Sequence, residues 1–140
     1  MLDSPSPIDL MAEANALLSR FMLALCVYRE ASNQSHLGKV LVAQVIQNRV
    51  SDKRWPDTYV GVITQRLQFS SFNLSDANNG RWPKENDRSW VDCLQAVDEM
   101  LSSSEQSTLA NHYHTKAVKP TWADPTKVTE IEGDHIFYNL

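Results

Sequence analysis

Glu30 is the residue whose setting most suggests acid chemistry, because it closely follows the eight apolar residues Phe21 to Tyr28. A helix that is apolar on every side is usually buried, so this carboxyl group should lie at the end of a buried helix. Burial disfavours the charged carboxylate, and a helix C-terminus adds negative potential. Both effects raise the pKa toward the range in which a carboxyl group donates a proton near neutral pH. The alternative is an ordinary solvent-exposed glutamate paired with Arg29.

Three histidines predict a different chemistry. His112 and His114 are separated by one residue, so on a strand both side chains point to the same face. With His135 and a carboxylate they could form a zinc site of the catalytic type. The sequence has no HExxH motif, and Cys26 and Cys93 complete no zinc spacing. Solvated or core-satisfied histidines are the commoner outcome, and we expect no metal or other cofactor.

Motifs of other catalytic classes are missing. The sequence has no GxSxG, GxGxxG or GxxxxGK[ST] motif, and Ser70 and Ser71 lack the strand–turn–helix context of a nucleophilic serine. Both cysteines lie in apolar helical patterns, which predicts buried thiols. Aromatic rings in polar segments can stack on sugars, or can pack as small cores under the loops. These aromatics are Trp55, Phe69, Phe72, Trp82, Tyr113, Trp122, Phe137 and Tyr138.

The order of the elements predicts an α+β fold. Apolar residues at helical spacing predict helices over residues 8–31, 37–50, 59–67 and 87–103. Residues 68–85 are rich in Asn, Ser, Gly and Pro, which indicates an ordered surface loop of the kind that carries binding residues. Strands are predicted over 110–114, 127–131 and 135–138. We therefore expect a helix-rich single domain, residues 8–140, with a small C-terminal antiparallel β element, after a flexible lead-in over residues 1–7.

Size and charge limit what the chain can be. Its 140 residues are 42% hydrophobic and 21% charged, which suits one globular core. The net charge of -4, without a basic cluster, argues against nucleic-acid binding. Asp3 and Asp9 precede any Lys or Arg, so the basic start of a signal peptide is absent. The run Phe21 to Tyr28 is too short to cross a bilayer, so we expect a cytosolic monomer without membrane insertion.

Several segments, in order, resemble one family of wall-cutting enzymes. Glu30-Ala31 and residues 38–50 are similar to its opening block, EA…G…VAxVIxNRV. The middle of the chain resembles FPDT…GVI…QFS at residues 55–58, 60–63 and 68–70. The end resembles YH…P.WA…GxHxFY at residues 112–114, 120–123 and 133–138. The resemblance covers roughly residues 26–138 and is to the cell-wall hydrolases of the spore-cortex-lytic type, the SleB/CwlJ-like hydrolases.

This resemblance implies a lysozyme-like fold in which a helix end delivers a glutamate to a cleft. It implies that Glu30 is the catalytic acid of a lytic transglycosylase or muramidase-like enzyme, which cuts peptidoglycan between N-acetylmuramic acid and N-acetylglucosamine. It also implies a set of groove-lining residues, namely Gln68, Phe69, Ser70, Tyr113, His114 and His135. The chain departs from the family at three positions, where Arg29 and Asn33 replace glycines and Gln34 replaces a second acid.

The missing acid bears on the mechanism. Hydrolysis by two carboxylates needs a partner about 5–9.5 Å from the acid. No convincing partner is evident, because the candidates lie in turn or cap contexts: Asp57, Asp76, Asp87 and Asp124. A lytic transglycosylase needs a single glutamate, so we expect Glu30 to act alone. The alternatives are a zinc-dependent amidase or peptidase that uses His112, His114 and His135, and a glycan-binding protein without turnover.

A wall-cutting enzyme without a signal peptide needs another route to the cell wall. A phage endolysin that passes through holin pores fits a small chain of one domain. A bacterial enzyme whose leader has been removed also fits, although Met1 argues against it.

Overall fold

The computed structural model describes residues 4–65, 69–72 and 76–140. Over these residues, four α-helices precede a three-stranded antiparallel sheet, which confirms the predicted α+β order. The helices are α1 (Pro7–Ala31), α2 (His36–Val50), α3 (Tyr59–Thr64) and α4 (Arg88–Ser102). The strands are β1 (His112–Thr115), β2 (Val128–Glu132) and β3 (His135–Tyr138). Short 3-10 turns lie at η1 (Ser70–Phe72), η2 (Ala77–Gly80) and η3 (Pro125–Lys127).

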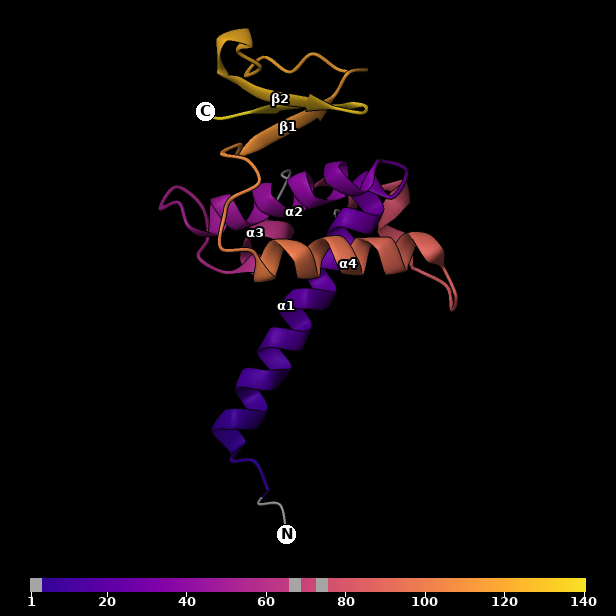
Figure 1. Cartoon of the computed structure of the whole chain (residues 1–140), viewed down its shortest axis with the longest axis vertical. Helices are drawn as coiled ribbons and strands as arrows, with labels where there is room; N and C mark the ends of the chain where they lie inside the picture. Colours follow the sequence, from indigo (N-terminus) through magenta and orange to yellow (C-terminus); the bar gives the residue numbers. More distant parts are fainter. Residues whose placement is uncertain (1–3, 66–68, 73–75) are drawn as a thin grey trace.

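Helix α1 has an exposed half and a buried half. Ser6 caps its start and forms a reciprocal capping box with Asp9, so the helix begins at Pro7, inside the predicted lead-in. Its C-terminal part is buried from Leu23 to Arg29, as its all-round apolar pattern predicts. The N-terminal part projects away from the body of the molecule (Figure 1). Its exposed apolar residues include Ile8, Leu10, Met11, Leu17 and Leu18.

The expectation that no segment is long enough to cross a bilayer was wrong for α1. The helix has 25 residues, and its most apolar 18-residue window has a mean hydropathy of 1.5. The expectation was based on the uninterrupted apolar run Phe21 to Tyr28. The helix is longer than this run, and Glu13 and Arg20 are single charged residues within an otherwise largely apolar stretch. About 28% of that window is buried in the domain, and a core helix or a signal sequence has the same length and composition.

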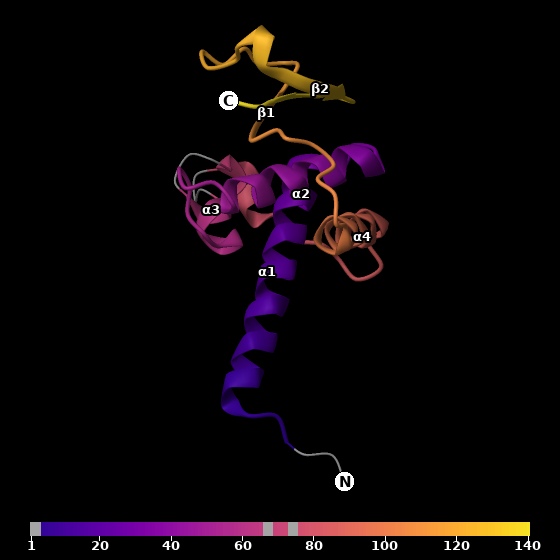
Figure 2. The ribbon, with the colours of Figure 1, turned by 60° about the vertical axis from the view of Figure 1, so that its left-hand side comes forward.

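The core forms where α1, α2 and α4 pack together. Buried residues of α1 and α2 make up most of it, and α4 adds Cys93, Ala96, Val97 and Met100. Cys26 and Cys93 are both buried free thiols, as predicted. Helix α2 is buried over most of its length because the helical body covers one side and the sheet lies over its other side (Figure 2).

The sheet has the strand order β1-β3-β2, with Tyr113 paired to Phe137 across β1 and β3. Successive side chains of a strand alternate between faces. Phe137 belongs to the core that the helices share, so Tyr113, His135 and Phe137 face the helical body. His112, His114 and Tyr138 therefore face away from it.

A polar latch joins the turn between β2 and β3 to the start of α2. Gln34 donates to Asp134 Oδ2 at 3.0 Å and accepts from the Asp134 backbone N–H at 3.0 Å, while Ser35 donates to Glu132 at 2.8 Å. Gly133 has φ 58, and a Cβ there would lie 2.4 Å from the Gln34 side-chain oxygen. The residue that replaces the family's second acid thus holds the hairpin in place.

Gly133→Ala should lower the free energy of unfolding by about 1–3 kcal/mol, because a left-handed alanine is strained and its methyl group displaces Gln34. Urea unfolding monitored by circular dichroism measures the loss. Gly80→Ala is the matched control, since a Cβ at Gly80 meets nothing within 4 Å. Equal stabilities of the two variants would contradict the role of the latch.

Candidate active site

The Glu30 carboxyl lies in the last turn of α1, directly behind the buried run that ends at Arg29. Burial raises its pKa from an ordinary 4.5 to about 7, and the negative charge of Asp76 acts in the same direction. A hydrogen bond with the Tyr113 side chain opposes this rise. A carboxyl group with a pKa near 7 is protonated in a useful fraction at neutral pH and can also act as a base.

Tyr113 reaches Glu30 from β1, which connects the sheet to the end of α1. Its ring lies 6.5 Å from the ring of Phe69, 5.0 Å from that of His135 and 5.7 Å from that of Phe137. Burial is the main cause of the raised pKa of the Tyr113 hydroxyl, and the charge of Glu30 adds to it. The hydroxyl therefore stays protonated and can donate to the Glu30 carboxylate.

Asp76 is a charge near Glu30 that its local sequence context did not predict. It caps η2 by accepting from the Asn78 backbone N–H at 2.8 Å, so the predicted cap context is confirmed. It also contributes to the pKa of Glu30, so the chain fold brings this loop to the end of α1. No local sequence signal distinguishes this aspartate from the other capping aspartates, because its proximity depends on how the loop returns to the helix.

Arg49 is a second group that the prediction missed. It is buried on α2, donates from Nε to the Asn111 carbonyl at 2.7 Å, and lies 5.4 Å from both the Trp55 and Phe69 rings. Its positive charge acts on Tyr113 and opposes the rise of the Tyr113 pKa. An arginine on the apolar face of a predicted helix is a signal that could have identified it, since buried cations need specific partners.

The histidines occupy opposite faces of the sheet. His112 and His114 lie 5.0 and 5.6 Å from the Trp122 ring, and His114 Nε2 shares a 2.7 Å hydrogen bond with the Tyr138 hydroxyl. His135 is 2% exposed and packs on Tyr113, on the side of Glu30. Burial lowers the pKa of both His112, to about 4, and His135.

The zinc alternative has no support in this arrangement. Its three histidines do not converge, because the sheet separates His135 from His112 and His114. Within the described part of the chain, no three side chains of His, Cys, Asp or Glu lie close enough together to hold a metal ion. The alternation of side chains along β1 correctly predicted that His112 and His114 share one face of the sheet. The register between β1 and β3 places His135 on the opposite face.

The predicted groove residues are only partly brought together. Tyr113 contacts Glu30, and the rings of Phe69 and His135 pack on Tyr113. His114 is not brought to this side, because it lies on the other face of β1. Ser70 is the first residue of η1, and Gln68 lies outside the described residues.

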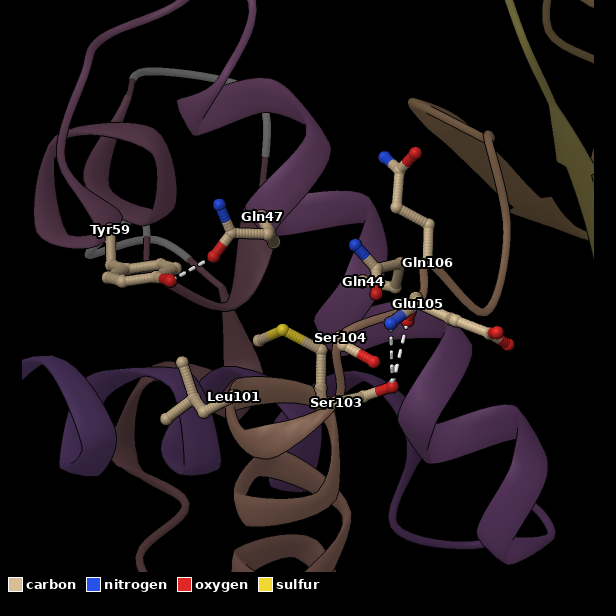
Figure 3. Close-up of a pocket in the computed structure, with 9 residues that line it drawn as sticks. Gln44, Gln47, Tyr59, Leu101, Ser103, Ser104, Glu105 and Gln106 are labelled. Carbon is tan, nitrogen blue, oxygen red and sulfur yellow. Dashed lines mark hydrogen bonds between the residues drawn. The ribbon is translucent and has the colours of Figure 1, made fainter.

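A separate polar pocket of about 180 Å³ lies between α2, Tyr59 and the end of α4 (Figure 3). Several of its polar groups bond one another, since Tyr59 donates to Gln47 and the Ser103 hydroxyl donates to the Glu105 carbonyl at 2.9 Å. The groups that act on Glu30 are not among its lining residues, so we assign it no part in the candidate site. The lining residues are Gln44, Gln47, Tyr59, Met100, Leu101, Ser103, Ser104, Glu105 and Gln106.

Tyr113→Phe should raise the pKa of Glu30 above about 7, because it removes the hydrogen bond that lowers this pKa. If Glu30 must be protonated to act, the alkaline limb of the pH–rate profile should then move to higher pH. The profile of kcat/KM over pH 5 to 9 measures the shift. A limb that stays in place or moves to lower pH would contradict the Glu30–Tyr113 interaction. Tyr59→Phe is the control, since Tyr59 bonds Gln47 instead.

Comparison with known proteins agrees with this architecture. The chain is 31% identical over 121 residues to a spore cortex-lytic enzyme of Halalkalibacterium halodurans, covering 84% of this chain and 34% of that protein. It is 31% identical over 119 residues to the spore cortex-lytic enzyme of Bacillus subtilis, covering 83% of this chain and 36% of that protein. The chain thus spans about a third of the length of these relatives.

Two solved structures are similar to this chain over most of their own length. The catalytic domain of the germination-specific lytic transglycosylase SleB from Bacillus anthracis is 25% identical, with a TM-score of 0.68 over 99% of both chains. The catalytic domain of the Bacillus cereus SleB protein is 27% identical, with a TM-score of 0.64 over 86% of this chain and 88% of that one. The predicted lysozyme-like fold and the resemblance noted in the sequence are both confirmed.

The family pattern of the cell wall hydrolases matches residues 33–138, which begins three residues after Glu30. The structural match extends over α1 as well, since it covers 99% of the chain. From its sequence match, its fold and its relatives, the chain belongs to the cell wall hydrolase family.

Proposed function

We propose that the chain is a peptidoglycan-cleaving lytic transglycosylase in which Glu30 is the single acid and base. The observation that carries the proposal is the partly buried Glu30 carboxyl at the end of α1, whose pKa is raised to about 7 and which Tyr113 contacts. Membership of the cell wall hydrolase family supports the substrate class. The printed description of the Bacillus anthracis relative as a lytic transglycosylase supports the reaction type.

The proposed reaction has two proton transfers. Protonated Glu30 donates its proton to the glycosidic oxygen between N-acetylmuramic acid and N-acetylglucosamine, and the bond to the leaving sugar breaks. The Glu30 carboxylate then accepts the proton of the muramic acid 6-hydroxyl, whose oxygen attacks the anomeric carbon and closes a 1,6-anhydro ring. The proton balance is restored at Glu30 and no water is consumed. A pKa near the working pH suits a group that must serve in both states.

The surroundings of Glu30 suit this cycle. Burial destabilises the carboxylate and so favours proton donation, whereas the Tyr113 hydrogen bond stabilises the carboxylate that remains after donation. The partly exposed ring of Tyr113 offers a surface for the sugar, and the buried Phe69 and His135 pack against this ring. Gln68 and Ser70 remain groove residues by resemblance, and His114 is left out of the groove.

Asp76 provides a specific reason to consider hydrolysis as a second candidate. Two carboxylates that act on one another through space are the arrangement that a hydrolytic glycosidase needs. Asp76 acts on Glu30 and could direct a water molecule to the anomeric carbon. Its engagement in capping η2 favours a structural role, so transglycosylation is the function we put forward.

Mass spectrometry of digested peptidoglycan separates the two reactions. We expect fragments that end in 1,6-anhydro-muramic acid, each lighter by one water than a reducing end. Asp76→Asn should leave this product unchanged if Glu30 acts alone. Reducing ends from the unaltered chain, lost in Asp76→Asn, would establish hydrolysis instead, and binding to sacculi without released fragments would establish a glycan-binding protein. Release through holin pores as an endolysin stays a prediction, as does the monomeric state.

A further inference from the structure

Arg29, the residue before Glu30, has side-chain contacts that the reaction scheme does not use. It is 7% exposed, and its guanidinium donates to three backbone carbonyls in one loop. The acceptors are Ser71 at 3.2 Å, Asn79 at 2.6 Å and Arg81 at 3.0 Å. Five donors in a fixed planar fork make arginine suited to several carbonyls at once, whereas the ammonium of lysine is a compact point charge.

Two aromatic rings complete the cradle around this guanidinium. Its central carbon lies 4.9 Å from the Phe72 ring and 4.9 Å from the Trp82 ring. A cation held against aromatic faces and out of water is attracted by the ring quadrupoles. The contacts come from both ends of the loop, because Phe72 belongs to η1 and Trp82 follows η2. One side chain of α1 therefore gathers the two described ends of this loop.

Arg81 makes the reciprocal connection. Its guanidinium donates to the Ser32 hydroxyl at 2.7 Å and to the Tyr28 carbonyl at 3.5 Å, and it lies 4.6 Å from the Tyr28 ring. Tyr28 lies two residues before Glu30 in the last turn of α1, and Ser32, two residues after it, is the C-cap of this helix. We call these interactions of Arg29 and Arg81 the arginine clasp. The clasp fastens the loop to the same helical turn that carries Glu30.

We propose that Arg29 is a positioning residue, whose side chain holds the described segments 71–72 and 76–81 against the end of α1 and so sets the side of the active site next to Glu30. The proposal rests on the proposed function of Glu30. Asp76 lies within this loop and acts on both Glu30 and Arg29, so the position of the clasp and the environment of Glu30 are linked.

The pH dependence gives the clasp a readout that a purely structural role would not share. The groups that act on Glu30 are Asp76 from the loop and Tyr113 from β1. Glu30 in turn raises the pKa of the Cys26 thiol on its own helix, and the charge of Arg49 acts on both Tyr113 and Cys26. Release of the loop moves the charge of Asp76 away and exposes Glu30 to water. Both changes lower the pKa of Glu30, so the alkaline limb of the pH–rate profile should move to lower pH.

The test uses the full chain with Arg29→Lys, Arg29→Gln and the control Arg20→Gln. Arg20 is on the same helix and is bound to Asp98 at 2.7 Å, so the control loses a hydrogen-bonded arginine that does not touch the loop. On soluble glycan strands we expect Arg29→Lys to lower kcat about tenfold, with a smaller change in KM, because displacement of the loop beside Glu30 misaligns the bound sugar. Arg29→Gln should lower kcat further, and Arg20→Gln should match the unaltered chain.

Backbone amide hydrogen exchange measures the clasp without reference to activity. Exchange in residues 76–81 should accelerate in both Arg29 variants, whereas exchange in α4 should stay at its original rate. If kcat and the pH profile of Arg29→Lys are unchanged, or exchange in 76–81 is unchanged, the proposal is wrong. If exchange accelerates equally in α4, Arg29 only stabilises the fold, which also overturns the proposal.

Two further variants keep the test decisive. Should the Arg29 variants fail to fold, Arg81→Gln weakens the clasp from its exposed side and should reproduce the loop-restricted exchange and the shifted limb; normal exchange there would overturn the proposal. Glu30→Gln is measured in parallel. If that variant retains its activity, the proposed function fails, and amide exchange still decides whether the clasp exists.

Discussion

Glu30→Gln should lower glycan cleavage by at least about two decades, because it keeps the shape of the side chain and removes the proton that the reaction transfers. Loss of general acid catalysis typically costs 10²- to 10⁴-fold. The rate of release of anhydro-muramic fragments from purified peptidoglycan measures the effect. Glu13→Gln, on the exposed half of the same helix, should cleave at the original rate. Near-normal turnover in Glu30→Gln would exclude Glu30 as the acid.

The same substitution should not unfold the protein, and its effect on stability has a definite sign. The folded pKa of Glu30, about 7, lies above its ordinary value of 4.5, so between these pH values the folded state binds more protons than the unfolded state. The stability contributed by protonated Glu30 is present below about pH 4.5 and is lost as the pH rises through 7. Gln cannot ionise, so Glu30→Gln should remove this slope.

Urea unfolding at pH 5 and pH 8 checks this expectation. The free energy of unfolding of Glu30→Gln should change less between the two pH values than that of the unaltered chain. At pH 8 the variant should be at least as stable, because it no longer buries a charge. An inactive but stable variant separates chemistry from folding. If the variant unfolds at pH 8, its loss of activity could come from unfolding and would not identify Glu30 as the acid. That result would also contradict the burial of Glu30.

Phe137→Ala should cost about 3–5 kcal/mol of the free energy of unfolding, the usual cost of a buried phenylalanine. Phe137 is 0% exposed, lies in the central strand β3 and belongs to the core shared with the helices. Domains of this kind are stable by only about 5–15 kcal/mol in total, so the loss is a large fraction. The Phe137 ring also lies 5.7 Å from that of Tyr113. Activity should therefore fall as well, because loosening the sheet from the helices displaces Tyr113.

Urea unfolding and amide exchange in the strands measure the effect of Phe137→Ala. Ile131→Ala in β2 is the matched control, since Ile131 is 57% exposed and should change stability by no more than about 0.5 kcal/mol. A loss below about 1 kcal/mol in Phe137→Ala would mean that the sheet is not part of the cooperative core. Loss of stability with unchanged cleavage would mean that Tyr113 keeps its position beside Glu30 even when the sheet packs less tightly on the helices.

Local pattern was sufficient for the order of the elements and for their approximate bounds. The predicted strand over 135–138 is β3, and the predicted helix over 37–50 begins one residue earlier, at His36. These elements follow from residue periodicity and from capping residues such as Ser35, which are properties of neighbouring residues. Helix α3 ends earlier than predicted, at Thr64, because a short apolar run marks a helix without marking its end.

Other features depended on contacts between distant parts of the chain. The exposed half of α1 also has apolar residues at helical spacing, so the sequence alone did not show that the other elements cover only the C-terminal half, which is apolar on every side. The sides taken by His114 and His135 depend on the register between β1 and β3, which no single strand encodes. Arg29 and Asp76 lie in ordinary local contexts, and their roles arise only when the loop returns to α1.

Glu30 contains both kinds of information. The sequence by itself determined that a glutamate follows an apolar helix, and therefore that its carboxyl group should be hard to ionise, because burial of that helix is a property of its own residues. The tertiary structure decided which groups surround it: Tyr113 from β1 lowers its pKa and Asp76 from the loop raises it. These two groups are far from Glu30 in the chain, so only the packing of the sheet and the loop against α1 could place them there.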